Sequence, residues 1–148
     1  LSDFKIFSEA GRALALLHVN YDAVAEYPVK VHRKDRPPDV SEADYWRVDQ
    51  MKFGPRSDRT KIIYNSGLAI GNIPEEAYRY AIGTRSAIEW VMDRYQVTQD
   101  KKTGIRNDVN DWSTEHGDDG YIFSLLQRII TCSMKTTEIV AGLPRLKL

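Results

Sequence analysis

The sequence contains one cysteine, Cys132, and no long apolar run. A lone cysteine excludes a disulfide within the chain and a thiolate pair for zinc, and it fits a reducing cytoplasm. No charged leader precedes an apolar stretch, so we expect neither a signal peptide nor contact with a membrane. The chain opens at Leu1, directly in a helical pattern. We therefore expect a single domain over residues 1–148, a C-terminal fragment of a larger multidomain protein.

Motifs that carry catalysis or bind metal are also missing. Pro38-Asp39 is not followed by the Glu-x-Lys pair of a nuclease, and there is neither a methyltransferase Asn/Asp-Pro-Pro-aromatic segment nor a Gly-Lys-Ser/Thr phosphate loop. His18, His32 and His116 lack the short spacing of a metal clamp. The acidic segment 107–119 lacks the residue order of a calcium loop. We expect no catalytic residue, cofactor or metal in this fragment.

The distribution of charge is more informative than its total. The 21 basic and 21 acidic side chains cancel, which argues against a protein that binds DNA on its own. One turn nevertheless gathers cations around Asp58, whereas acidic residues crowd the later segment 107–119. The cations of this turn are Lys52, Arg56, Arg59 and Lys61. We therefore predict that one face is basic.

Apolar periodicity predicts long helices at both ends. Apolar residues recur every three or four positions from Phe7 to Val24, which indicates a helix that Pro28 ends. The same spacing from about Tyr121 predicts a last helix able to pack along the first. Two central helices are expected, one from Pro74 to about Gly83 and one opened by a capping box of Ser86 and Glu89.

Between the terminal helices, alternating and β-branched residues predict strands bounded by turn residues. The expected strands cover residues 27–31, 45–53, 60–64 and 68–70. The predicted fold is α+β, a small antiparallel sheet within about residues 27–70 with a long N-terminal helix, two central helices and a long C-terminal helix. We expect the three tryptophans, Trp46, Trp90 and Trp112, to lie in the core.

Two basic segments are candidates for nucleic-acid binding. In the first, Lys52, Arg56, Arg59 and Lys61 have the chemistry to bind phosphates, and arginine can donate a bidentate pair to guanine. In the second, Lys101, Lys102 and Arg106 flank Thr103-Gly104, while Gln99 and Asn107 have amides suited to adenine. The alternatives are a solvated hairpin tip for the first segment and, for the second, a loop whose Asn-Asp pairs shape turns and anchor Trp112.

The stretch from Ile73 to Trp112, IPEEAYRYAIGTRSAIEWVMDRYQVTQDKKTGIRNDVNDW, resembles the C-terminal target-recognition domain of type ISP restriction–modification enzymes. The likeness extends more loosely to TKIIYNSGLAIGNIP and to DFKIFSEAGRALALLHVNYD. It implies recognition of a short site in double-stranded DNA, with a methyltransferase module of the same polypeptide holding the other side. The parent would then be an N6-adenine methyltransferase with an ATP-dependent endonuclease and helicase, and S-adenosylmethionine, ATP and magnesium would bind to its other modules.

Two other classes of function fit parts of the sequence. The neutral charge and long apolar stripes also suit a protein–protein docking domain of a helicase-like or other multidomain protein. Salt dependence separates docking from DNA binding, because phosphate contacts weaken steeply with salt. A stand-alone enzyme ranks last, because no nucleophile–base or metal pattern converges.

Overall fold

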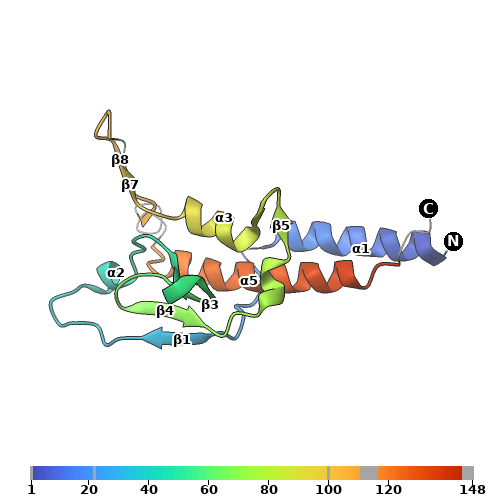
Figure 1. The fold of residues 1–148 in the computed structure, drawn as a ribbon, viewed down its shortest axis with the longest axis horizontal. Coiled ribbons are helices and arrows are strands. Elements are labelled where there is room, and N and C mark those ends of the chain that lie inside the picture. The colour runs from blue at the N-terminus through green and yellow to red at the C-terminus, as the bar shows by residue number, and fades with distance from the viewer. Residues whose placement is uncertain (1, 22, 100, 111–116, 145–148) are drawn as a thin grey trace.

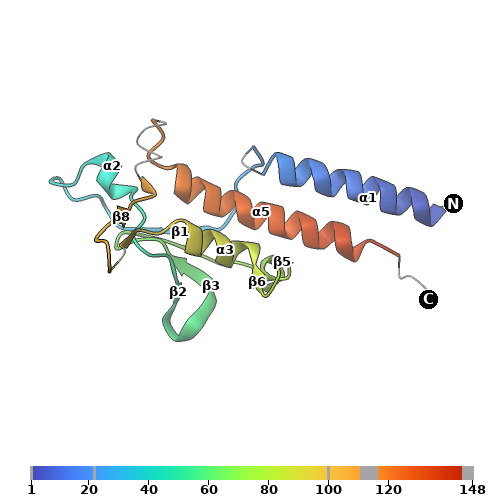
Figure 2. The ribbon, with the colours of Figure 1, turned by 90° about the horizontal axis from the view of Figure 1, so that it is seen from above.

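The computed structural model describes residues 2–21, 23–99, 101–110 and 117–144. Two long helices lie side by side, and a sheet packs near one end of the pair (Figures 1 and 2). These helices are α1 (Ser2–Val19) and α5 (Tyr121–Ala141), which run in opposite directions. Both the start of α5 and its packing along α1 were predicted from the apolar spacing.

The first helix is shorter than its apolar stripe suggested. It ends at Val19, and the chain beyond it runs along α5 instead of continuing as a helix to Pro28. Backbone groups of this segment bond to α5, with Thr131 Oγ1 donating to the carbonyl of Ala25 (2.7 Å) and Tyr27 N–H donating to the carbonyl of Gln127 (3.2 Å). Contacts with α5 therefore replace the helical hydrogen bonds that a local pattern predicted.

The central sheet is antiparallel, as predicted, and has four strands in the order β1-β4-β3-β2. The strands are β1 (Lys30–Arg33), β2 (Lys52–Gly54), β3 (Asp58–Ile63) and β4 (Leu68–Gly71). In the middle of the sheet, Ile62 of β3 pairs with Ile70 of β4, and both side chains are fully buried. One face of the sheet therefore closes the core against the helices.

The core contains large apolar side chains from the sheet and from α5. Tyr64 is fully buried, its ring lies edge-on to Phe123 (5.1 Å), and its hydroxyl donates to the carbonyl of Trp46 (2.7 Å). Cys132 is buried on α5, and burial raises the pKa of its thiol, which keeps it protonated and unreactive at neutral pH.

The predicted strand over residues 45–53 was largely wrong. Residues 42–45 form the short helix α2 (Glu42–Tyr45), which Ser41 caps by accepting from Asp44 N–H (3.1 Å). Strand β2 begins only at Lys52. Between them, Asn65 Nδ2 donates to the carbonyls of Tyr45 and Arg47, both at 2.9 Å. A side-chain amide from another part of the chain thus donates hydrogen bonds to backbone carbonyls that would otherwise need a neighbouring strand as their partner.

The first of the two predicted central helices was also wrong. A single 3-10 turn, η2 (Glu75–Tyr78), follows Pro74, and the chain then forms a tight hairpin of β5 (Ala81–Ile82) and β6 (Arg85–Ser86). Gly83 takes a left-handed φ of 71° at the turn, a conformation that glycine adopts without strain. The glycine therefore reverses the chain instead of ending a helix.

The second central helix, α3 (Ala87–Arg94), is confirmed together with its capping box. Ser86 Oγ accepts from Glu89 N–H, and a Glu89 carboxylate oxygen accepts from Ser86 N–H, both at 3.2 Å. Trp90 on this helix is 45% exposed, so the prediction that it lies in the core was wrong. Its Nε1–H donates to the carbonyl of Ile82 (2.8 Å), which holds the ring over the β5–β6 hairpin. Trp46 is half-buried against the core, and Trp112 lies outside the described residues.

Replacing Ser86 with alanine removes one half of this capping box. We expect a loss of about 1 kcal/mol in the free energy of unfolding, because the Glu89 N–H at the start of α3 loses its acceptor. Urea denaturation followed by circular dichroism measures the change. Ser8→Ala on α1 is the matched control and should shift the free energy of unfolding by less than about 0.5 kcal/mol, because Ser8 is exposed in the middle of a helix. An equal response of the two variants would contradict the capping role.

Candidate nucleic-acid interface

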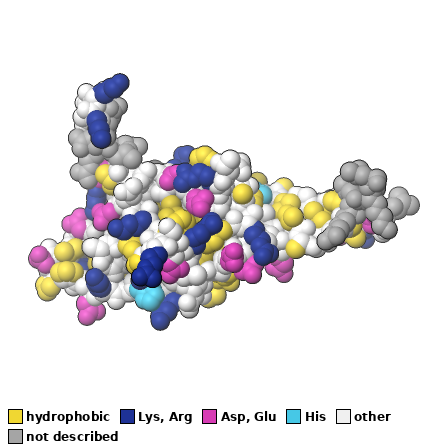
Figure 3. Space-filling view, viewed as in Figure 1, with side chains coloured by type: hydrophobic (Ala, Val, Ile, Leu, Met, Phe, Trp, Pro, Cys, Tyr) yellow, Lys and Arg dark blue, Asp and Glu magenta, His cyan; other side chains and the backbone are white. Residues whose placement is uncertain are grey.

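Two hairpins project from the body of the molecule in different directions. The turn between β2 and β3 extends on one side of the helix pair (Figure 2), and the arm formed by β7 (Thr98–Gln99) and β8 (Arg106–Asn107) extends on another (Figure 1). Each projection carries one of the two basic segments predicted as candidates. Lys and Arg side chains gather over the sheet and at the end of the arm (Figure 3).

The β2–β3 turn holds Arg56 in an unusual backbone conformation. Residues 55–57 form the 3-10 turn η1 (Pro55–Ser57), in which Arg56 and Ser57 have φ values of 60° and 58°. Left-handed residues other than glycine cost roughly 1–2 kcal/mol each, so such strain often marks a functional segment. The conformation leaves the Arg56 side chain exposed at the tip.

Asp58 is the acidic residue of this turn, and it shapes the backbone. Its carboxylate accepts from Thr60 Oγ1 (2.6 Å) and from Thr60 N–H (3.0 Å). The pKa of Asp58 is lowered, first by the Thr60 hydroxyl and then by the Thr60 N–H. Asp58 is therefore ionised at neutral pH, and its negative charge partly offsets the cations around it.

Arg59 is engaged within the domain. Its Nη2 lies 3.0 Å from Glu89 Oε1, and its guanidinium lies 4.2 Å from the centre of the Tyr78 ring. The Tyr78 hydroxyl in turn donates to the Arg59 carbonyl (2.5 Å), and burial raises the pKa of Tyr78, so this hydroxyl remains a donor at neutral pH. Arg59 thus ties the β2–β3 hairpin to the start of α3, and a contact of Arg59 with DNA remains a prediction.

The second basic segment was predicted as a loop and contains a short antiparallel ladder. Gln99 pairs with Arg106 and Thr98 pairs with Asn107. The side chains of Gln99, Arg106 and Asn107 lie outside the described part of the structure. Lys101 and Lys102 are exposed near the tip, where Gly104 has a left-handed φ of 71°. Ile105 is 68% exposed on the same arm and is suited to contact a thymine methyl group.

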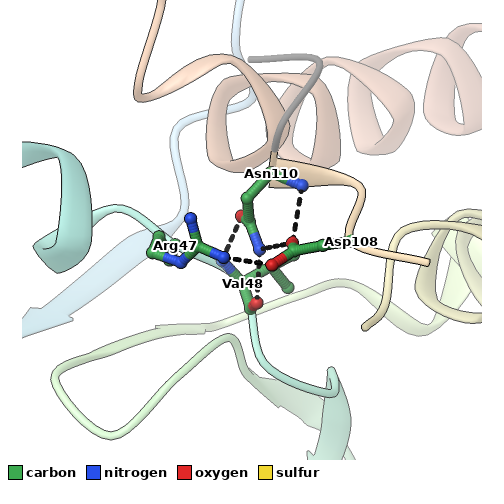
Figure 4. A network of polar contacts seen from close by, with 4 residues as sticks. All are labelled: Arg47, Val48, Asp108 and Asn110. Carbon is green, nitrogen blue, oxygen red and sulfur yellow. Dashed lines mark hydrogen bonds and ion pairs between the residues drawn. The ribbon is translucent and has the colours of Figure 1, made fainter. Parts of the chain in front are cut away.

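A buried polar network anchors the base of this arm (Figure 4). Asn110 is 4% exposed, and its Oδ1 accepts from Val48 N–H (2.8 Å) while its Nδ2 donates to the Val48 carbonyl (3.0 Å). Asp108 accepts from the Asn110 side-chain amide (2.8 Å) and pairs with Arg47. Asp108 and Asn110 therefore shape and fix the segment, which agrees with the turn-forming interpretation for these two residues.

Strand β1 and the residue that follows it carry basic side chains that neither of the two predicted basic segments contains. Lys30, His32 and Lys34 are exposed and alternate with Val31 and Arg33. The Arg33 guanidinium lies within the domain against two aromatic rings, 5.3 Å from the centre of the Tyr45 ring and 5.5 Å from the centre of the Trp46 ring. The alternation from residue 27 predicted a half-buried strand over residues 27–31, which was wrong in part, because β1 begins only at Lys30 and all four of its residues are exposed.

Other kinds of site receive no support from the described residues. Among them, no helix combines the length and apolarity needed to cross a membrane. In the same part of the chain, no three His, Cys, Asp or Glu side chains gather closely enough to hold a metal ion.

Comparison with solved structures shows that the chain is similar to parts of enzymes that were solved with DNA. The chain is 39% identical, with a TM-score of 0.82, to the Type ISP restriction-modification enzyme LlaGI, solved as a nuclease-deletion mutant in complex with a DNA substrate mimic. It is 36% identical, with a TM-score of 0.84, to the ATP-dependent Type ISP enzyme LlaBIII bound to DNA. DrdV, solved as a DNA complex, is 25% identical with a TM-score of 0.72.

These likenesses span nearly the whole chain but a small part of each relative. They cover 97%, 97% and 100% of this chain and 13%, 9% and 15% of LlaGI, LlaBIII and DrdV, respectively. No curated protein matches the chain. Residues 1–125 match the family described as the Type ISP C-terminal specificity domain. The chain therefore belongs to the Type ISP C-terminal specificity domain family, and it is the target-specificity domain of a restriction–modification enzyme.

Proposed function

We propose that this domain reads a short sequence in double-stranded DNA, and that it does so with the β2–β3 turn and the β7–β8 arm. The observation that carries the proposal is the family match, together with two similar enzymes that were solved with DNA. The exposed Arg56 at the tip of one projection and the exposed Lys101 and Lys102 on the other supply matching chemistry. The cations proposed to contact DNA are Lys52, Arg56, Arg59, Lys61, Lys101, Lys102 and Arg106, with Gln99 and Asn107 as amide donors and acceptors.

In this proposal the two projections have different tasks. Arg56 is held out by a strained turn, so its planar guanidinium is suited to donate to a guanine in the major groove. The lysines of the arm are point charges on flexible stems, which suit phosphates better than base edges. The lysines of the arm would therefore position the domain along the duplex, whereas Arg56 of the turn and the amides of Gln99 and Asn107 would read bases.

Chemistry on DNA would belong to other modules of a longer polypeptide. This chain spans less than a sixth of each similar enzyme, so most of the length of each enzyme lies outside the region that matches this chain. We propose that they methylate adenine at N6 with S-adenosylmethionine and cut DNA with ATP and magnesium, in the cytoplasm. The methyltransferase module is the proposed partner of this domain, and it would supply phosphate contacts that a chain of zero net charge lacks.

Part of α1 has the surface expected of a contact with that module. Phe4, Leu16 and Val19 are 76%, 60% and 75% exposed, although each is large and apolar. Leu16 and Val19 lie one turn apart near the end of α1, and exposed large apolar side chains that lie together are typical of a protein interface. Docking therefore accompanies DNA recognition in this proposal, and the two activities use different parts of the fold.

The salt dependence of binding to duplex DNA tests the proposal. Fluorescence anisotropy with a labelled duplex, repeated over a series of salt concentrations, gives the slope of log affinity against log salt. Each phosphate contact contributes about −0.9 to this slope. We expect a slope steeper than about −3 for the domain, given four or more exposed cations on the two projections. A slope near zero would rule out the proposed phosphate contacts.

A further inference from the structure

The outward face of the sheet carries a set of cations drawn from three strands. Cross-strand pairing places His32 opposite Ala69, Ala69 opposite Ile63, and Ile63 opposite Lys52. Side chains directly opposite one another lie on the same face, and so do side chains two residues apart along a strand. The residues of this face that bear charge or an imidazole are Lys30, His32, Lys34, Lys52 and Lys61, which we call the open sheet face. Arg59, two residues before Lys61, is not part of it, because its guanidinium lies over the rings of Phe53 and Tyr78 next to the irregular register of β2 and β3.

The face opposite is the buried one, so the two sides of the sheet are distinct. Ile62 and Ile70 pair across β3 and β4 and are fully buried, whereas Val31, which pairs with Ile70 on the same side at the edge of the sheet, is 41% exposed. Because side chains alternate along a strand, Lys61 on β3 and His32 on β1 must point away from the core. The strand register therefore places these basic side chains together on one face of the sheet.

The open sheet face is concave where β1 and β3 flank β4. A hollow of about 340 Å³ is lined by His32, Lys34, Lys61 and Ile63 together with the β3–β4 turn, and no carboxylate is among its described lining residues. Gly71 on β4 allows the His32 ring to lie close to the strand, because a Cβ at that position would lie 3.0 Å from His32 Nε2. Lys34 N–H donates to the Gly67 carbonyl (2.9 Å), which fixes the rim of the hollow.

Lysines on an edge strand have a second explanation. Strands β1 and β2 are the two edges of the sheet, and lysine on an edge discourages pairing with another chain. That explanation accounts for Lys30 and Lys52, but it does not account for Lys61, because β3 is an inner strand. Nor does it explain why the described residues that line the hollow include no acidic residue, in a chain with as many acids as bases.

We propose that the open sheet face binds the phosphate backbone of the DNA duplex beside the bases that the β2–β3 turn reads. The proposal rests on the proposed function and adds Lys30, His32 and Lys34 to the contact surface. The positive charge of this surface favours the binding of a polyanion. Lys61 lies on β3, the strand that follows the turn containing Arg56, so it connects this surface to the turn. Such contacts carry no sequence information and instead set the orientation of the duplex.

The test is a titration of the ¹⁵N-labelled domain with a short duplex at low salt, followed through its amide resonances. The expected result is that amides of β1 and of β3 near Lys61 shift together with those of residues 55–57. Shifts confined to residues 55–57 and to the arm would overturn this proposal and leave the proposed function standing. If no resonance shifts, both the proposal and DNA binding by this domain are wrong.

Matched variants measure the contribution of these charges. Lys30→Gln combined with Lys61→Gln is expected to reduce the magnitude of the salt slope by about 1.8, two contacts at about 0.9 each, for specific and unrelated duplexes alike. Lys5→Gln is the control, because Lys5 is an exposed cation that faces Glu9 on α1, far from the sheet. Both proteins should give native amide spectra. Equal slopes for the double variant and the control would overturn the proposal.

Discussion

Replacing Asn110 with alanine is expected to lower the free energy of unfolding by about 2–4 kcal/mol, because it strands both the N–H and the carbonyl of Val48 in a buried site. Each orphaned buried group costs roughly 1–3 kcal/mol, and Asp108 also loses a donor. At roughly 2–4 °C per kcal/mol for a domain of this size, the melting temperature should fall by about 4–16 °C.

Calorimetry and urea denaturation measure this loss directly. Asn20→Ala is the matched control, because Asn20 donates to the Leu16 carbonyl (3.1 Å) at an exposed position where water replaces the bond. It should change the free energy of unfolding by less than about 0.5 kcal/mol. If Asn110→Ala cost no more than Asn20→Ala, the network at the base of the arm would not hold that segment in place.

Replacing Arg56 with alanine is expected to weaken binding to the recognised DNA sequence by about 5–150-fold, the loss of one bidentate contact to a base. Binding to unrelated duplexes should weaken less, because a single charge contributes less there. Competition anisotropy with specific and unrelated duplexes measures both affinities. Arg56 is exposed at the turn, so the variant should fold normally.

Two further variants test whether Arg56 contacts a base or a phosphate. Arg56→Lys keeps the charge and loses the planar guanidinium that can donate two parallel hydrogen bonds. It should therefore reduce discrimination between sequences while preserving the affinity for unrelated DNA. Arg12→Ala removes an exposed charge from α1 and should change neither affinity. Equal weakening of specific and unrelated binding by Arg56→Ala would mean that Arg56 contacts a phosphate and reads no base.

Several elements were predictable because their signals are local. The capping box of Ser86 and Glu89 lies within four residues of sequence, and the apolar spacing of α5 begins where the helix does, at Tyr121. The antiparallel sheet followed from strands separated by turn residues. In each case the residues that determine the element are neighbours in the sequence.

The errors arose where distant residues decide the structure. The segment after Tyr45 is aromatic and β-branched, yet it is held by the amides of Asn65 and Asn110, which lie up to 62 residues away. No local pattern predicts that a side chain will take the place of a neighbouring strand. The helix expected from Pro74 is a single turn because Gly83 reverses the chain, although a glycine at that place also suits a helix end.

The candidate site was predictable in part for the same reason. The cations around Asp58 are close in sequence, so their clustering was visible. The partner of Arg59 was not, because Glu89 lies 30 residues away on α3. The open sheet face could not be predicted from the sequence either, because its basic residues come from separate strands. Only the pairing of β1, β4, β3 and β2 brings them to one face.

Selection from a pool of randomised duplex DNA at low and moderate salt, with sequencing of the retained molecules, tests the central claim most directly. If this domain reads DNA sequence, one motif should be enriched over the input, and Arg56→Ala should erode the enrichment, whereas Lys101→Ala should lower the amount of DNA retained without changing the motif. If the retained duplexes match the input at every salt concentration, the domain does not recognise sequence by itself, which would contradict the proposed function.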